Sequence, residues 1–212
     1  MSAMSCDCAR LIADIEAFEP FNEQESVDKQ VILRALKTDP DCFERSAQAH
    51  MATSIWTVDA AFERTLLEWH NIYQSWSWIG GHADGVADLR AVALRELEEE
   101  TGVRGRILPY GRGVWAESGD IFSLEVLTVD GHEKRGAYVG SHLHLNVTYL
   151  AQANPDEPLK VKPDENSALK WAPLDDAVRL STEPWIRDRI YRKLIDKTRA
   201  YACSNPSNAA SI

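Results

Sequence analysis

The chain has 212 residues, 44% of them hydrophobic, which is enough for one main core but not for two full domains. Its 33 acidic and 23 basic residues give a net charge of -10, which excludes a broad basic surface for nucleic acid or an anionic membrane. No apolar run reaches transmembrane length, and the N-terminal residues lack the pattern of a signal peptide. We therefore expect a cytoplasmic protein with no nucleic-acid or membrane partner.

The first part of the chain predicts two helices. Apolar residues recur at helical spacing over 11–18, before Pro20 interrupts the pattern. Asn22 is a candidate N-cap for a second helix over 23–37, which Asp39 and Pro40 end. We expect a helical extension over residues 1–46. Two alternatives stay open for it, packing on the core or forming a homodimer contact.

The rest of the chain predicts strands around one strong helix. Residues 88–101 form this helix, which Gly102 closes, and residues 183–201 form an amphipathic C-terminal helix. This pattern predicts an α+β fold for a main domain over 47–203, followed by a disordered tail over 204–212. The predicted strands cover 51–58, 65–69, 76–79, 121–129, 143–149 and 168–171, and 130–140 is a polar connecting loop.

Three acidic side chains share one face of the helix over 88–101. Each helical residue advances by about 100°, so Glu96, Glu99 and Glu100 lie together, while Glu98 points away and is interpreted as a solvated charge. Carboxylates on one face repel each other, and those in the last turn oppose the helix dipole. A bound divalent cation relieves both effects, and hard oxygen ligands suit Mg²⁺ or Mn²⁺. The alternative is an acidic helix face exposed to solvent.

The residues around this helix resemble a known motif. Gly81 and the run R-E-L-E-E-E-T-G-V from Arg95 to Val103 are similar to the Nudix box, G-x5-E-x7-R-E-U-x-E-E-x-G-U, where U is aliphatic. Every position matches except the first glutamate, which is Ala87 here. The resemblance covers roughly residues 50–173. It implies the Nudix α/β/α sandwich with a mixed sheet, flanked by the N-terminal helical segment and the C-terminal helix.

The resemblance also implies an activity and its residues. It implies hydrolysis of the diphosphate bond of a nucleoside diphosphate linked to another group, or of a nucleoside triphosphate, with Mg²⁺ or Mn²⁺ as cofactor. Glu165 lies where Nudix enzymes often place an extra acid, and a plain loop carboxylate is the alternative reading. The implied metal ligands and catalytic residues are Glu96, Glu99 and Glu100, and the implied loop residues are Gly81, Arg95 and Gly102.

Because Ala87 replaces the first box glutamate, the motif does not determine which side chain supports Arg95. In the family, the first box glutamate commonly helps to anchor the loop to the arginine that corresponds to Arg95. We expect Asp84 or Asp88 to take over this contact, because both lie on the loop and at the start of the helix.

Four histidines predict a second site. His142 and His144 share one face of a strand with Asn146 and Thr148, and this polar face lines either solvent or a binding groove. His50 begins another strand, and His82 follows two glycines. Their places are similar to those of metal ligands in isopentenyl diphosphate isomerases, which share the Nudix fold. This resemblance implies a second, histidine-rich metal site. The alternative is a polar strand face with a loop histidine bonded to backbone.

Two other functions compete with hydrolysis. The isomerases carry a catalytic cysteine just before the histidine that resembles His82, and Gly80 and Gly81 stand there instead. A Nudix fold that senses a nucleotide without turnover would be favoured by loss of the box glutamates, and these are present. Both observations favour the hydrolase.

Overall fold

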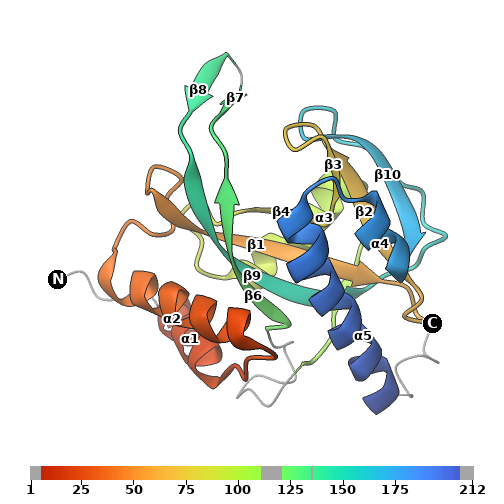
Figure 1. Ribbon diagram of the computed structural model, residues 1–212, viewed down its shortest axis with the longest axis horizontal. Helices are drawn as coiled ribbons and strands as arrows, with labels where there is room; N and C mark the ends of the chain where they lie inside the picture. Colours follow the sequence, from red (N-terminus) through yellow and green to blue (C-terminus); the bar gives the residue numbers. More distant parts are fainter. Residues whose placement is uncertain (1–5, 111–120, 135, 206–212) are drawn as a thin grey trace. The chain divides into compact units, whose positions relative to one another are not determined.

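The computed structural model describes residues 6–110, 121–134 and 136–205 (Figure 1). The chain divides into two compact units. The boundary between the units falls within three elements, so that each has residues in both units: strand β1 (Ala49–Val58), helix α3 (Leu89–Thr101) and strand β9 (His142–Gln152). Unit 1 comprises Met1–Ser54, Gly80–Ala93 and Leu108–Tyr149, and unit 2 comprises Ile55–Ile79, Leu94–Ile107 and Leu150–Ile212.

The two predicted N-terminal helices are present in unit 1 as α1 (Cys6–Ala17) and α2 (Glu23–Thr38). Asn22 caps α2, as its sequence position predicts. Helix α2 lies along strand β6 (Ser123–Val129), where the Gln24 amide donates to the backbone oxygen of Leu124 at 3.0 Å. The helical extension therefore packs on the sheet within its own unit.

In unit 1 the strand order is β4, β1, β9, β6, with β4 spanning Ile79–His82. Strands β6 and β9 are antiparallel and place Leu127 opposite His144. The prediction of a polar connecting loop over 130–140 was wrong. This segment holds an antiparallel hairpin of β7 (His132–Lys134) and β8 (Ala137–Val139). Most of this hairpin is exposed, so its residues lack the apolar alternation that marks a half-buried strand.

In unit 2 the strand order is β10, β2, β1, β9, β5, and β3 pairs with β2. The strand predicted over 76–79 is divided between β3 and β4. Strands β2 and β10 are antiparallel, with an irregularity just after Asn166 that places Leu169 opposite Glu68. The bounds of the strands in this unit that have not yet been given are β2 (Arg64–His70), β3 (Ser75–Ser77), β5 (Arg106–Ile107) and β10 (Asn166–Pro173).

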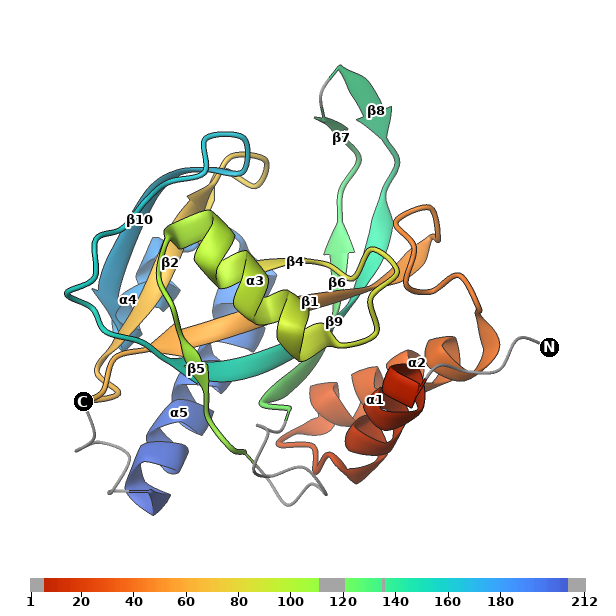
Figure 2. The ribbon, with the colours of Figure 1, turned by 180° about the vertical axis from the view of Figure 1, so that it is seen from behind.

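The strands of unit 2 lie between helices. Figure 2 shows α3 in front of the strands and α5 behind them. The helix predicted over 183–201 begins as a π-helical segment, η2 (Ile186–Tyr191), and continues as α5 (Arg192–Ser204). A short helix, α4 (Leu174–Leu180), precedes it, and sequence reasoning did not predict it. Of the predicted tail over 204–212, Ser204 ends α5, and residues 206–212 lie outside the described residues.

Within the described ranges, no helix combines the length and the apolar character needed to cross a membrane.

Candidate active site

Helix α3 ends where the sequence predicts. Gly102 has a φ of +74°, a left-handed conformation that glycine adopts without a steric penalty, and its amide donates to the backbone oxygen of Glu98. The Glu98 side chain is exposed and accepts from Arg104 Nε at 2.8 Å. The prediction that Glu98 is a solvated charge is thus confirmed.

The other three carboxylates differ in exposure and in partners. The Glu96 side chain is 13% exposed and accepts from Arg95 at 2.8 Å, while Glu99 is 49% exposed and lies 3.4 Å from Lys162 Nζ. Glu100 is only 5% exposed, and its Oε2 atom is buried with no hydrogen-bond partner among the described residues. A buried, unpartnered carboxylate oxygen is costly. Glu100 is therefore the acid whose surroundings most need a cation.

Strand β2 contributes a fourth acid that sequence reasoning missed. Glu68 is 1% exposed, and its Oε2 accepts from the Asn166 amide at 2.8 Å. The same Asn166 amide nitrogen donates to the backbone oxygen of Glu100 at 3.0 Å, so one side chain links β2 to the end of α3. The available signal was a carboxylate inside the apolar strand segment L-L-E-W, where a charge is rarely buried without a reason.

The acids perturb one another. Burial raises the pKa of the Glu68 carboxyl to about 7 against the opposing hydrogen bond from Asn166, and the negative charge of Glu165 adds to the rise. Burial raises the pKa of Glu100 to about 10, and the negative charges of Glu68 and Glu96 contribute. Glu165 lies at the turn before β10, where its backbone oxygen accepts from Asn71. Unit 2 thus gathers the predicted Glu96, Glu99, Glu100 and Glu165 with Glu68 around Lys162.

The loop before α3 lies in unit 1. The Asp84 carboxylate forms an ion pair with Arg45, and Asp88 Oδ1 accepts from the backbone amide of Ala91 at 3.1 Å. The support of Arg95 by Asp84 or Asp88 stays a prediction. Gly81 lies in β4, next to Gly80, whose backbone approaches β1 closely. A Cβ atom at residue 80 would lie 2.5 Å from the backbone oxygen of Thr53, so only glycine fits without a shift of the backbone.

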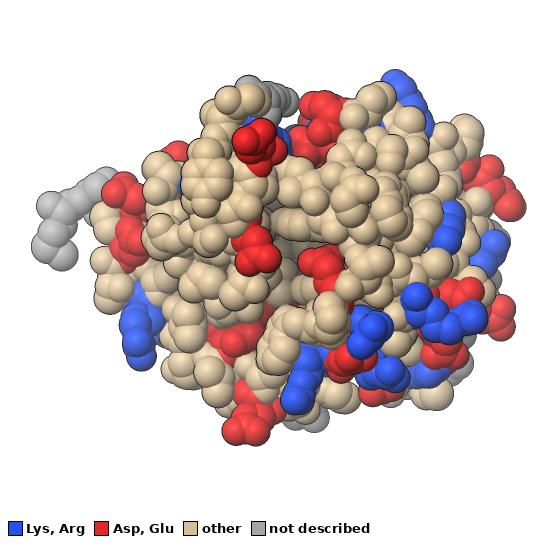
Figure 3. Space-filling view, turned by 45° about the horizontal axis from the view of Figure 1, so that its top comes forward, with Lys and Arg blue, Asp and Glu red and all other residues tan. Residues whose placement is uncertain are grey.

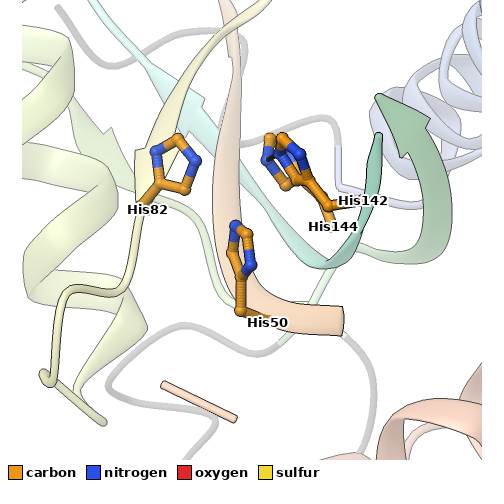
Figure 4. Close-up of side chains that lie close together, drawn as sticks. All are labelled: His50, His82, His142 and His144. Carbon is orange, nitrogen blue, oxygen red and sulfur yellow. Dashed lines mark hydrogen bonds between the residues drawn. The ribbon is translucent and has the colours of Figure 1, made fainter. Parts of the chain in front are cut away.

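The four histidines form a second cluster, which lies wholly in unit 1 (Figure 4). β1 carries His50, β4 carries His82, and β9 carries His142 and His144. Each ring offers one nitrogen, and these four nitrogens all lie within 4.8 Å of one another. The structure therefore brings together the histidines that the sequence grouped, which we call the histidine cluster.

Hydrogen bonds fix the tautomer of two rings in the histidine cluster. His50 Nδ1 lies 2.8 Å from the Ala47 carbonyl oxygen, and His142 Nδ1 lies 2.9 Å from that of Gly140. A carbonyl oxygen can only accept, so both Nδ1 atoms carry the hydrogen, and in the neutral form of each ring Nε2 presents a lone pair. His50 Nε2 is buried and has no partner among the described residues.

The other two rings are held neutral by burial. Burial lowers the pKa of His82 to about 3, with the positive charge of Arg45 adding to the effect. Burial likewise lowers the pKa of His144 to about 2, and His82 and His50 contribute. Neutral imidazoles are the form that binds metal ions.

Strand β9 differs from expectation beyond His144. Asn146 and Thr148, predicted to line solvent or a groove, are buried instead. Asn146 Nδ2 and Thr148 Oγ1 donate to Glu125 Oε2 at 3.0 and 2.8 Å. A neighbouring strand supplies the carboxylate, which the sequence of β9 alone does not reveal.

A comparison with protein families matches residues 49–194 to the NUDIX domain. The chain belongs to the Nudix family. It is a Nudix hydrolase, and the family match confirms the predicted fold class, the α/β/α sandwich with a mixed sheet.

Solved structures of this fold are similar to the chain. A NUDIX family hydrolase from Clostridium perfringens is 16% identical, with a TM-score of 0.49 over 72% of this chain and 97% of that one. An Ap4A hydrolase from C. elegans is 19% identical, with a TM-score of 0.44 over 73% and 98%. A MutT NUDIX hydrolase from Burkholderia pseudomallei is 19% identical, with a TM-score of 0.43 over 71% and 98%. A search of curated proteins finds no match.

Proposed function

We propose that this Nudix hydrolase cleaves the diphosphate bond of a small nucleotide-like substrate, with Mg²⁺ or Mn²⁺ held by Glu96, Glu99 and Glu100. The substrate is a nucleoside diphosphate linked to another group, or a nucleoside triphosphate. The observation that carries the proposal is the buried Glu100 carboxylate, whose Oε2 has no partner among the described residues although other acids surround it.

The residues of unit 2 fit a hard divalent cation. Carboxylate oxygens are the ligands that Mg²⁺ and Mn²⁺ prefer, and Glu100 offers an oxygen that no described residue satisfies. When bound, such a cation polarises the phosphate oxygens of a substrate and lowers the pKa of an attacking water. The sequence prediction of this cofactor therefore has a physical basis in the burial of Glu100.

Neighbouring side chains keep the acids in place. Arg95 holds Glu96 through a 2.8 Å hydrogen bond, and Lys162 lies 3.4 Å from Glu99. Asn166 orients Glu68 beside Glu100, and Glu68 has a pKa near 7 and so exchanges a proton near neutral pH. We assign Glu165 the role of an additional acid at this site, as its position in the sequence predicts.

Gly80 favours the hydrolase over an isomerase. The isomerases that the sequence resembles place a cysteine just before the histidine that corresponds to His82. At residue 80, even a Cβ atom would lie 2.5 Å from Thr53 O and 2.8 Å from Ser54 Oγ. A nucleophilic side chain at residue 80 would therefore require a shift of the backbone.

The charge distribution fits a small substrate. Figure 3 shows acidic and basic side chains interspersed on the face in view, and the described residues form no continuous basic stripe for a nucleic acid on that face. The net charge of -10 points the same way.

Activity assays on single glutamine variants test the proposal. Nucleoside diphosphate derivatives and nucleoside triphosphates are incubated with enzyme and Mg²⁺ or Mn²⁺, and the released nucleotide and phosphate products are measured. We expect Glu99→Gln and Glu100→Gln each to lower the hydrolysis rate on the order of 100-fold, because each removes a charged ligand.

Glu98→Gln is the matched control. It makes the same chemical change on the same helix, but its side chain is exposed and pairs with Arg104. Its rate should stay near that of the wild type. Equal rates for the wild type, Glu99→Gln and Glu100→Gln would overturn the proposal, and binding of a nucleotide without any turnover would favour a sensor instead.

A further inference from the structure

The histidine cluster lies wholly in unit 1, and its geometry calls for an explanation of its own. Four imidazoles come from three strands that are distant in the sequence, and five of the six pairs of ring centroids lie 4.8 to 5.2 Å apart. Among the described residues, no carboxylate belongs to this group of ligand atoms.

The ring nitrogens of the cluster converge. His142 Nε2 and His144 Nε2 are 3.2 Å apart, and because Nδ1 of His142 donates to Gly140, a hydrogen bond between the two neutral rings runs from His144 to His142. His50 Nε2 also presents a lone pair, which is buried without a partner among the described residues. A buried acceptor without a donor is costly. A cation among the four ring nitrogens would satisfy His50 Nε2 and take the other three as further ligands.

The distances suit a metal with short bonds to nitrogen. Two imidazole nitrogens that bind one tetrahedral Zn²⁺ at about 2.05 Å lie about 3.3 Å apart, close to the 3.2 Å between His142 and His144. The remaining pairs lie within 4.8 Å, so small side-chain rotations close the gap. Metal-ligating histidines also commonly donate their second nitrogen to a backbone carbonyl, as His50 and His142 do.

We propose that the histidine cluster binds a divalent first-row transition metal such as Zn²⁺, at a site separate from the carboxylates of α3. Neutral imidazole nitrogens are borderline donors that suit Zn²⁺ and its neighbours and not Mg²⁺. The four ligands add no negative charge, so the bound ion keeps its full charge of two. Three of the four histidines are half-buried rather than buried, which leaves room for an exchangeable anion or water on the ion.

A cobalt titration tests the site, because Co²⁺ replaces Zn²⁺ and its visible absorption reports nitrogen ligands. The protein is purified without a polyhistidine tag, stripped with a chelator and titrated with CoCl₂. Bound metal is then counted by elemental analysis after reloading with ZnCl₂. We expect one equivalent with a visible absorption band in the wild type, and at least roughly 100-fold weaker binding in His82→Ala and His144→Ala.

Two controls make the outcome specific. His132→Ala removes a neighbouring histidine that is not in the cluster, and it should leave Co²⁺ binding unchanged. The Glu99→Gln, Glu100→Gln double variant should keep the Co²⁺ band even where hydrolysis is lost. A failure of the proposed histidine site can therefore be told apart from a failure of the proposed hydrolase site. Circular dichroism of the metal-free variants checks folding, and His82→Gln replaces His82→Ala if the latter does not fold.

Two results would overturn the site. One is Co²⁺ binding by His82→Ala and His144→Ala that matches the wild type. The other is an absorption band that disappears in the glutamine double variant but persists in the histidine variants, which would place the metal at the carboxylates.

Discussion

The amide of Asn166 donates a hydrogen bond of 2.8 Å to Glu68, and both side chains are buried. The same Asn166 side chain accepts from the backbone amide of Lys162 and donates to the backbone oxygen of Glu100. One residue therefore holds strand β2, the end of α3 and the turn before β10 together at the acidic site.

Replacing Asn166 with aspartate should destabilise the fold. The change removes the donor to Glu68 and places a second carboxylate beside it, so we expect a loss of about 3 kcal/mol at pH 8. The loss should be smaller at pH 5, where a carboxyl proton restores the donor. Urea denaturation at both pH values measures it. Asn154→Asp, in a surface turn of the same unit, is the control, and equal stability of the two variants would contradict the role of Asn166.

The metal-free protein should lose stability as the pH rises above 7, because of Glu100. Its pKa in the folded state is raised from 4.5 to about 10, so between these values the folded chain keeps a proton that the unfolded chain releases. The free energy of unfolding then falls with pH, by at most about 1.4 kcal/mol per unit. The half-buried His82 and His144, whose pKa values are lowered from 6.5, are neutral in the folded state and release only a small remaining fraction of a proton in the unfolded state between pH 7 and 9, so they contribute little.

Glu100→Gln isolates this effect. In chelator-treated protein, its unfolding free energy should change less between pH 7 and 9 than that of the wild type, while Glu98→Gln should follow the wild type. Mg²⁺ or Mn²⁺ should stabilise the wild type more than Glu100→Gln at pH 9. Parallel pH profiles for Glu100→Gln and the wild type would show that Glu100 keeps no proton in the folded state.

Gly80→Ala should destabilise unit 1. The added Cβ would lie 2.5 Å from the Thr53 oxygen, which belongs to the backbone and so cannot rotate away. We expect a loss of roughly 1–3 kcal/mol from the forced shift, measured by chemical denaturation. Gly140→Ala is the matched control, because a Cβ atom added there would meet no described atom within 4 Å. A Gly80→Ala variant as stable as this control would refute the close approach of β4 to β1.

A serine hydroxyl joins α2 to β6. Ser123 Oγ lies 2.6 Å from Glu25 Oε1 and also contacts Glu125 Oε1, and all three residues are buried. A hydroxyl has one hydrogen, so we expect one of the two carboxyl groups to bring a second proton to these contacts.

Two substitutions test this shared proton. Glu25→Gln should be tolerated, because its amide can donate to Ser123 while its oxygen keeps the bond from the Phe21 amide. Ser123→Ala should cost about 1–3 kcal/mol, since two buried acids lose their common partner, whereas Ser167→Ala at an exposed position should cost little. Thermal melts compare the three variants. A Glu25→Gln variant less stable than Ser123→Ala would argue against the shared proton.

Local spacing was enough to predict the acidic face of α3 and its end. The rotation per residue separates Glu98 from Glu96, Glu99 and Glu100, and the left-handed conformation explains Gly102, because both effects act within a few residues. The Nudix family followed from the same short run with Gly81, whereas the histidines were grouped by their strand positions and by the resemblance to isopentenyl diphosphate isomerases.

Only the tertiary structure revealed the contacts that join distant segments. Glu68 and Asn166 are 98 positions apart, and Glu125 buries Asn146 from a neighbouring strand. A strand sequence shows which residues share a face, but the strand that packs beside it decides whether that face meets water, a carboxylate or three more histidines. For this reason the sequence by itself determined which acids share a helix face, and the pairing of strands decided which of them is buried without a partner.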